Sequence, residues 1–328
     1  MSYTHLTEQE RVCIYHQQHC DFSHAESGRR LHRHRATIGR ELKRFRRHPS
    51  WPYYHQYFPD GAEWLARQRR ARPRGFRWIT HRPLLAYVLK GLRKEWSPQQ
   101  ISGRIQIDYP EDDRMRVSHP SIYRYIKAEK EAGGSLWKRL RQSQKLRRKQ
   151  YGSGARRCRI PHRIGIEHRP AQVEAREEVG HWEADTMLGR NGRLATCVER
   201  KSRYLLIARL PDGTACQFNS AAIRQFRKIP VRWRKTLTTD NGSEFIEHQT
   251  LARRLGFQTF FATPYASWER GTNENSNGLI RQYVPKKADV SQLSYQRVAR
   301  IAAKLNNRPR KCLGYRTPAE VLGPVLRL

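Results

Sequence analysis

The feature of this sequence that most constrains its fold is the alternation of strand-like and helix-like runs after about residue 179. The helix-like run that follows the last of these strands contains Glu274. Strands that alternate with helices are typical of a sheet covered by helices. We therefore predict an α/β domain over residues 179–328, ending in a helical tail. The expected strands span about 180–188, 194–199, 204–210, 235–239 and 258–262, and the helices between them about 216–228 and 245–255.

Three acidic residues stand on different elements of this predicted domain. Asp185 lies within the first strand, Asp240 directly follows the fourth, and Glu274 lies on the late helix. Carboxylates gathered within a few Å raise one another's pKa unless a cation neutralises them, so the cluster predicts bound Mg²⁺, with Mn²⁺ as a substitute. Two such ions about 4 Å apart activate a water or a 3′-hydroxyl and stabilise the leaving oxygen in phosphodiester displacement.

Each of these acids also has an ordinary structural explanation. Asp240 begins an Asp-Asn-Gly sequence that is typical of a turn. Asp185 can be explained as a polar residue near a strand end, and Glu274 as a surface acid on a helix. Neighbouring acids also compete for the same function, one of them on the same strand face as Asp185. These competitors are Glu183, Glu244 and Glu269.

The whole chain is strongly basic. It has 65 Lys and Arg against 29 Asp and Glu, and a formal net charge of +36. An excess of this size attracts phosphates, so we expect a polyanion as the partner. No apolar window approaches the length of a membrane span, and the N-terminus lacks the apolar core of a signal peptide. We therefore expect a cytoplasmic protein without a membrane partner.

The six cysteines form no CxxC pair, which argues against a disulfide framework. Cys13, His16 and Cys20 fall on one predicted helix with residue types that zinc binds. Their spacing matches no common zinc finger. A half-buried amphipathic helix is therefore favoured over a metal site, and the metal site stays open as the lesser alternative.

Residues 1–48 predict a helix-turn-helix module. A capping box over Thr7–Glu10 begins the first helix, Ser23 caps the second, and the third spans about 34–46. A solvated basic helix in an ordinary bundle is the alternative, but residues 29–47 hold nine Lys or Arg against one acid, which favours DNA binding. The candidate DNA contacts on the third helix are Arg35, Thr37, Arg40 and Arg44.

Residues 81–132 predict a second helix-turn-helix module. Its first helix covers about 84–94, and Ser97–Pro98 supplies an N-cap followed by proline at the first position of the next helix. Ser118 is expected to cap the last helix, whose apolar residues face inward. The outward candidates for base contacts are His119, Ser121 and Arg124.

Two linkers are expected between these modules and the α/β domain. Residues 49–80 contain an aromatic, proline-rich stretch without a clear period. Residues 133–178 form a basic linker, because 136–166 holds eleven Lys or Arg, no acid, and the interruption Tyr151-Gly-Ser-Gly154. Such a segment contacts phosphates without reading sequence, and a disordered connection between domains is a compatible interpretation.

Long, specific strings surround the three acids. They are His181-Trp-Glu-Ala-Asp-Thr186, Thr238-Thr-Asp-Asn-Gly-Ser-Glu-Phe245 and Ala262-Thr-Pro-Tyr-Ala-Ser-Trp-Glu-Arg-Gly-Thr-Asn-Glu-Asn-Ser-Asn-Gly278. The strings closely resemble the insertion-sequence-thirty (IS30) family of bacterial DDE transposases. The 33 residues from 241 through 273 that separate the second and third acids match the family's spacing. Similar strings at 96–103, 117–125 and 305–318 extend the resemblance over almost the whole chain, which departs from it around His24–Gly28 and at Pro120.

The resemblance implies a ribonuclease-H-like, retroviral-integrase-type catalytic core preceded by all-α DNA-binding modules. It selects Asp185, Asp240 and Glu274 as the catalytic and metal-binding residues, and it places Arg281 near DNA. It also implies a nucleoid-associated enzyme that binds the terminal inverted repeats of an element and target DNA, and transfers a 3′-hydroxyl end as a homodimer or larger assembly. Supporting hydrogen bonds are expected from Asn241, Asn273 and Asn277.

Two rival functions belong to other classes. A DNA-binding regulator built on an inactive core would need no acidic triad, so the three intact acids disfavour it. A structure-directed nuclease of the same fold would cleave without joining ends. The strings of the second helix-turn-helix and of the tail disfavour that nuclease.

Overall fold

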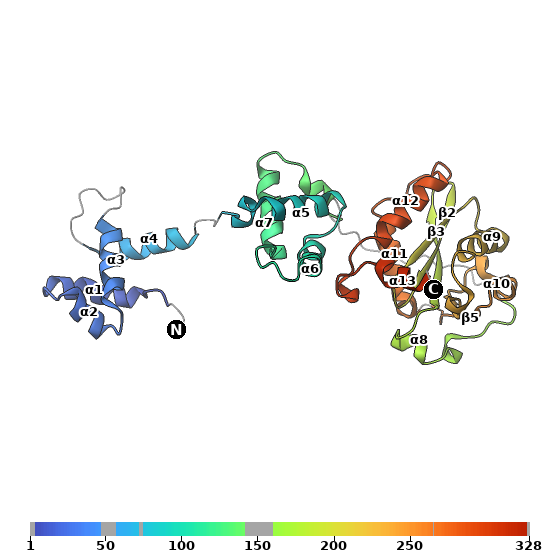
Figure 1. Ribbon diagram of the computed structural model, residues 1–328, viewed down its shortest axis with the longest axis horizontal. Coiled ribbons are helices and arrows are strands. Elements are labelled where there is room, and N and C mark those ends of the chain that lie inside the picture. Colours follow the sequence, from blue (N-terminus) through green and yellow to red (C-terminus); the bar gives the residue numbers. More distant parts are fainter. Residues whose placement is uncertain (1–3, 47–56, 72–74, 142–159, 265, 327–328) are drawn as a thin grey trace. The chain divides into compact units, whose positions relative to one another are not determined.

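The computed structural model describes residues 4–46, 57–71, 75–141, 160–264 and 266–326. The chain divides into two compact units, Met1–Gly75 and Phe76–Leu328 (Figure 1). Among the described residues, no helix is both long and apolar enough to cross a membrane.

The described residues of the first unit form four helices. Thr7 caps the first helix through the predicted capping box with Glu10, and Ser23 caps the second by accepting a hydrogen bond from the Glu26 amide. The three predicted helices are therefore confirmed. The helices are α1 (Glu8–His19), α2 (His24–Arg30), α3 (Arg35–Arg46) and α4 (Pro59–Ala71).

Helix α4 corrects the prediction that residues 49–80 are only a linker. Leu65 packs into the core that α1 and α3 form around Ile14 and Ile38. In addition, the buried Arg11 guanidinium on α1 pairs with Glu63 of α4 at 2.7 Å. These partners lie about fifty residues away along the chain, so the local pattern of residues 57–71 did not reveal the helix. Residues 47–56 and 72–74 lie outside the described residues.

The second unit begins with another helical module, as predicted. Ser97 forms a capping box with Gln100, whereas the Ser118 side chain accepts no capping hydrogen bond and only occupies the N-cap position. Leu84, Ile101 and Ile122 are buried in the core of the module. Its helices are α5 (Arg82–Arg93), α6 (Pro98–Asp108) and α7 (His119–Glu131).

A five-stranded sheet in the order β3-β2-β1-β4-β5 forms the centre of the remaining chain. The first three strands pair antiparallel, and β4 and β5 run parallel to β1. The predicted strands are confirmed to within two residues at each end. They are β1 (His181–Gly189), β2 (Gly192–Glu199), β3 (Leu205–Leu210), β4 (Thr236–Thr239) and β5 (Gln258–Phe261).

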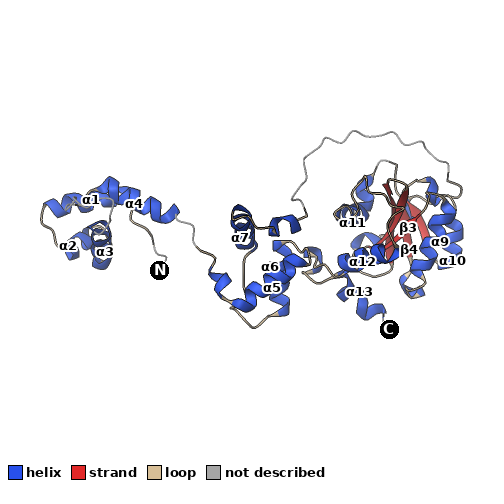
Figure 2. Ribbon diagram, turned by 90° about the horizontal axis from the view of Figure 1, so that it is seen from above, coloured by secondary structure: helices blue, strands red, loops and turns tan. Residues whose placement is uncertain are grey.

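Helices cover both faces of this sheet (Figure 2). On one face, α9 and α10 enclose a core that includes Trp182 and Phe218. On the other, α11 and α12 enclose a core that includes Met187 and Leu279. Strand β1 contributes to both cores because its side chains alternate between the faces. The helices of this part are α8 (Gln172–Ala175), α9 (Ala215–Phe226), α10 (His248–Leu255), α11 (Gly271–Ile280) and α12 (Tyr295–Asn306).

The tail after α12 packs on the second helical module. Arg104 of α6 donates hydrogen bonds of 2.6 and 2.7 Å to both carboxylate oxygens of Glu320, on α13 (Pro318–Leu326). The ring of Tyr315 lies so close to Gly103 that a Cβ there would approach it to 2.3 Å. Residues 142–159, the middle part of the predicted basic linker over 133–178, lie outside the described residues.

Candidate active site

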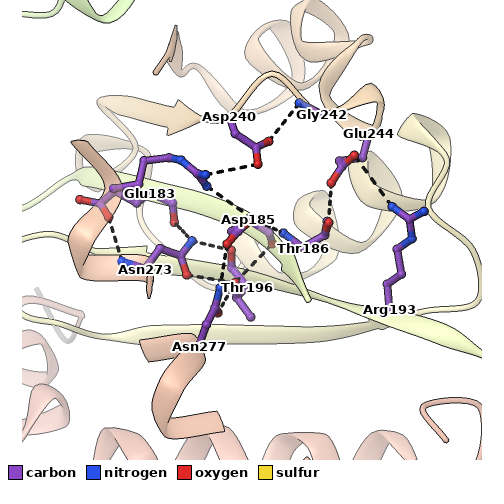
Figure 3. A network of polar contacts seen from close by, with 11 residues as sticks. Glu183, Asp185, Thr186, Arg193, Thr196, Asp240, Gly242, Glu244, Asn273 and Asn277 are labelled. Atoms are coloured by element: carbon purple, nitrogen blue, oxygen red, sulfur yellow. Dashed lines mark hydrogen bonds and ion pairs between the residues drawn. The ribbon is translucent and has the colours of Figure 1, made fainter. Parts of the chain in front are cut away.

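The pairing of β1 with β4 sets the first two predicted acids side by side. Glu183 is the register partner of Thr238, and two residues further along these parallel strands come Asp185 and Asp240. Both carboxylates are mostly buried, at 18% and 34% exposure of the side chain. Figure 3 shows the two aspartates facing one another at the carboxyl end of β4.

One arginine bridges this pair. Arg270, in the turn before α11, places Nη1 3.4 Å from Asp185 Oδ1 and Nη2 3.3 Å from Asp240 Oδ2. Its side chain is 12% exposed. Arg270 was not predicted from the sequence, although it directly follows Glu269 in one of the strings that carry the resemblance.

Burial disfavours the ionised form of both aspartates. It raises the pKa of Asp185 to about 6, where the Arg270 charge opposes the rise and the Asp240 charge adds to it. Burial also raises the pKa of Asp240, against the effect of Arg270 and with a contribution from Glu244. Two desolvated carboxylates that need a neighbouring cation have the donor chemistry that Mg²⁺ and Mn²⁺ prefer, so the residues present fit a divalent metal.

Helix α11 is bonded directly to Asp185. Asn277 donates from Nδ2 to Asp185 Oδ2 at 2.7 Å. Thr196, the register partner of Asp185 on β2, donates to Asn277 Oδ1 and Asn273 Oδ1 at 3.0 and 3.1 Å. The Thr186 amide supplies a further hydrogen bond of 2.8 Å to Asp185 Oδ1. These contacts fix the orientation of the aspartate (Figure 3).

Glu183 shares the face of Asp185, as its position on the strand predicted, but its carboxylate is used within the fold. It is fully buried and pairs with Arg200 at 2.6 Å. Its other oxygen accepts a 2.9 Å hydrogen bond from the Asn273 amide, and its carbonyl accepts one of 3.2 Å from the Asn273 side chain. Glu183 therefore anchors the first turn of α11.

The other two competing acids also have local partners. Glu244 accepts a hydrogen bond from the Thr186 hydroxyl and lies 4.0 Å from Arg193. Glu269 accepts 2.7 and 3.0 Å hydrogen bonds from the amide and hydroxyl of Thr263. Asn241, expected to support the site, donates a 2.8 Å hydrogen bond to the Ala262 carbonyl.

Glu274 is the one predicted catalytic acid that the structure does not bring to the pair. Its side chain is exposed, between Asn273 and Asn277 on α11. Among the residues that the structure describes, no three His, Cys, Asp or Glu side chains are placed to share one metal ion. Cys13, His16 and Cys20, considered above as a lesser alternative for a metal site, are therefore not placed to share an ion either. Three carboxylates repel one another, and Arg270 supplies only one positive charge to the two aspartates.

The candidate DNA contacts divide by exposure. Arg35 and Arg40 on α3 are exposed and Thr37 is half-buried, while the Arg44 side chain lies outside the described residues. On α7, His119 and Arg124 are exposed.

Two other candidates have partners within the fold. The Ser121 hydroxyl, expected to face outward, accepts a 3.1 Å hydrogen bond from Trp78 and is half-buried. Arg281, just after α11, donates a 2.8 Å hydrogen bond to the Leu188 carbonyl. Tyr123, which was not among the predicted contacts, is 44% exposed on α7.

Comparison with protein families finds two matching domains. An integrase core domain matches residues 175–267, and a helix-turn-helix domain matches residues 2–44. The integrase match contains Asp185 and Asp240 and ends before Glu274. Together with the order and directions of the five strands, it confirms the predicted ribonuclease-H-like core behind an all-α helix-turn-helix region.

Several known proteins are similar over nearly the whole chain. The transposase for insertion sequence element IS4351 of Bacteroides fragilis is 36% identical over 96% of this chain and 94% of its own length. Transposase InsI for element IS30A of Escherichia coli strain K12 is 35% identical over 97% of this chain and 83% of its own length. The transposase for element IS1086 of Cupriavidus metallidurans is 34% identical over 99% of this chain and 96% of its own length. One solved structure, the catalytic core domain of BIV integrase, matches 46% of this chain and 97% of its own, at 19% identity and a TM-score of 0.37.

Proposed function

The chain belongs to the IS30 family of insertion-element transposases, and we propose that it cuts DNA at the terminal inverted repeats of its element and joins the freed 3′-hydroxyl ends to target DNA. It is a DDE-type polynucleotidyl transferase, with an integrase core for the chemistry and helix-turn-helix helices for DNA binding. The core depends on a divalent metal.

We assign metal binding to Asp185, Asp240 and Glu274, with two Mg²⁺ or Mn²⁺ ions shared among them. The observation that carries this assignment is the position of Asp185 beside Asp240. In addition, Asn277 links Asp185 by a hydrogen bond to α11, the helix that contains Glu274. When bound, the ions lower the pKa of the attacking hydroxyl and stabilise the leaving oxygen. The chain's own residues orient the carboxylates: Asn277 and the Thr186 amide hold Asp185 by hydrogen bonds.

We assign the reading of the element ends to α3 and α7. The exposed side chains on these helices that supply charge and hydrogen bonds for a major groove are Arg35, Arg40, His119 and Arg124. Thr37, Arg44, Ser121 and Arg281 remain candidates for phosphate contacts beside them. We place the first DNA-binding module at residues 4–71, because α4 belongs to the same core as α1 and α3. Bringing two ends together requires at least a homodimer on DNA.

The two rival functions make different predictions. A regulator with an inactive core would have no need for two desolvated aspartates beside one another, which cost stability unless they serve a cation. A nuclease without joining activity would release cut ends and stop there. The products of a single reaction therefore separate the three functions.

The decisive experiment incubates purified protein with labelled DNA that carries the element ends, with MgCl₂ or with EDTA. We expect wild type to nick and join the DNA only with Mg²⁺. We expect Asp240→Asn to bind the ends as wild type does and to give neither product, while Glu269→Gln, the matched acid beside the site, retains both. Nicked DNA without joined products would favour the nuclease. Joining by Asp240→Asn would overturn the assignment.

A further inference from the structure

A separate pocket lies against a different face of helix α11. Its volume is about 300 Å³. Asn273 and Asn277 of α11 face the aspartate site, whereas three other side chains of the same helix line this pocket. The lining includes Thr272, Asn275 and Ser276 together with Arg176, Arg203 and Arg310.

Two of the three arginines of this pocket, Arg203 and Arg310, have buried donors without acceptors among the described residues. No acidic side chain is among the lining residues that the structure describes. Arg310 is only 9% exposed, its Nη2 donates to the Leu305 carbonyl at 3.3 Å, and its buried Nε has no hydrogen-bond partner in the described structure. Arg203 donates from Nη1 to the Thr272 hydroxyl at 2.7 Å, and its buried Nε likewise lacks a partner there. Buried donors left unpaired are costly, so these point to a missing acceptor.

Positive charge is concentrated here. Burial, followed by the charges of neighbouring arginines with Arg308 first, lowers the pKa of Arg310 to about 10. Burial and the charges of Arg203 and Arg200 lower the pKa of Arg176. The positive charges of these arginines repel one another. A second pocket of about 600 Å³ shares Arg176 and Arg203 and adds Lys201 and Arg316, so the basic lining continues beyond the first pocket.

We propose that this arginine pocket, defined by Arg176, Arg203 and Arg310, binds a backbone phosphate of the DNA strand that the active site processes. Guanidinium groups match the geometry of phosphate oxygens and bind them through paired hydrogen bonds. The adjacent hydroxyls of Thr272 and Ser276 add further polar groups to the lining. A carboxylate of a second copy is the other available anion. The chain's excess of 65 basic over 29 acidic residues favours the phosphate.

The pocket and the aspartate site share one helix, which determines what the phosphate contact would do. An α-helix with its side chains is about 10 to 12 Å across. A phosphate held on one face of α11 therefore lies only a few nucleotides from the bond that reacts at the Asp185 side. The contact would position the strand and would not read its sequence. This inference rests on the proposed function, because it needs DNA at the active site.

The test measures DNA affinity of the full chain in EDTA, by fluorescence anisotropy, between 50 and 300 mM NaCl (roughly the range over which counterion release is read). Two duplexes are used, one with the element end and one of random sequence. We expect Arg176→Gln and Arg310→Gln each to make the slope of log K against log salt less negative by about 0.9, equally on both duplexes. Arg310→Lys keeps the charge and should restore most of the slope. Arg253→Gln, an exposed arginine on α10, is the matched control and should leave the slope unchanged.

A second measurement locates the phosphate. Single phosphates near the cleaved end are replaced by neutral methylphosphonates. We expect one position at which this replacement weakens binding by wild type and by Arg253→Gln but not by Arg176→Gln.

Unchanged slopes for Arg176→Gln and Arg310→Gln would overturn the proposal. If Arg310→Gln does not fold by circular dichroism, the exposed Arg176→Gln decides alone. Unchanged slopes together with altered sedimentation of the DNA-free protein would show that the pocket takes a carboxylate of a second copy, and the proposal would be wrong. Because these measurements need neither metal nor strand transfer, they succeed or fail separately from the catalytic assignment.

Discussion

The side-chain amide of Asn277 donates a 2.7 Å hydrogen bond to Oδ2 of Asp185, which ties helix α11 to the central strand of the sheet. We predict that Asn277→Ala lowers strand transfer about 10- to 100-fold, the usual loss when a group that orients a metal ligand is removed. End-DNA binding measured by anisotropy should stay as in wild type. Asn307→Ala, which removes an exposed amide bonded only to its own helix, is the control. Equal activity of the two variants would contradict the positioning of Asp185 by Asn277.

Arg270 lies where a cation is needed between Asp185 and Asp240. We predict that Arg270→Gln lowers the free energy of unfolding in EDTA by about 1–3 kcal/mol, because the two carboxylates lose their counter-charge. MgCl₂ should then raise the melting temperature of the variant more than that of wild type. Arg281→Gln, whose guanidinium bonds a carbonyl and no carboxylate, should respond to Mg²⁺ as wild type does. The same Mg²⁺ response in all three proteins would rule out this function of Arg270.

The raised pKa of Asp185 gives the metal-free protein a specific pH dependence. The folded carboxyl, with a pKa of about 6, holds a proton that the unfolded chain releases near 3.8. Its stabilising effect is complete below about pH 4 and is lost as the pH rises through about 6. In urea titrations with EDTA, Asp185→Asn should lack this component. A pH dependence identical to that of wild type would show that Asp185 is not the group responsible.

Metal binding should show the opposite pH dependence, since the ion needs the ionised carboxylate. We predict that the affinity for Mg²⁺, measured by calorimetry, falls by up to about tenfold for each pH unit below 6. An affinity that stays constant from pH 7 to pH 5 would argue against Asp185 as a ligand.

Glu183 provides a test of whether an acid close to the aspartate pair has a structural function. Its carboxylate pairs with the fully buried Arg200 at 2.6 Å, so Glu183→Gln removes the buried one of the two carboxylates that pair with Arg200 and leaves only the exposed Glu174, at 3.0 Å. We predict a loss of about 3–5 kcal/mol in the free energy of unfolding, measured by urea denaturation. Glu269→Gln, at a partly exposed acid, should cost less than 1 kcal/mol, roughly the value of a surface interaction. A Glu183→Gln protein as stable as wild type would contradict the anchoring of α11 by Glu183.

Arg124 tests the recognition helix of the second module. Because it is exposed on α7, we predict that Arg124→Ala weakens binding to element ends by about 1–3 kcal/mol and binding to random DNA by much less. Lys127→Ala, one turn away on the same helix, is the matched control and should weaken both alike. Equal losses on both DNAs for Arg124→Ala would reduce it to a phosphate contact.

The sequence predicted the strands and the main helices of the core well, because their apolar periodicity is local. It also placed Asp185 and Asp240 at positions that the sheet register brings together. Periodicity failed at α4, whose stability comes from Leu65 in a shared core and from the pairing of Glu63 with Arg11. Such interactions depend on residues far apart along the chain.

Charge interactions across the site were the least predictable part. Arg270 reaches Asp185 across 85 positions of sequence and carries no periodic signal. For the same reason, nothing in the local pattern of α7 revealed that Trp78 holds the Ser121 hydroxyl. Glu274, which family spacing predicts beside the aspartates, is exposed on α11, so its place in the triad stays a prediction.

The most direct test of the account is a titration of Mn²⁺ into the full chain bound to end DNA, followed by electron paramagnetic resonance. If Asp185, Asp240 and Glu274 share the metal site, wild type and Glu269→Gln should bind Mn²⁺ with the same stoichiometry and affinity. Glu274→Gln should lose at least one bound ion or about tenfold in affinity. A Glu274→Gln protein that binds Mn²⁺ as wild type does would contradict the triad.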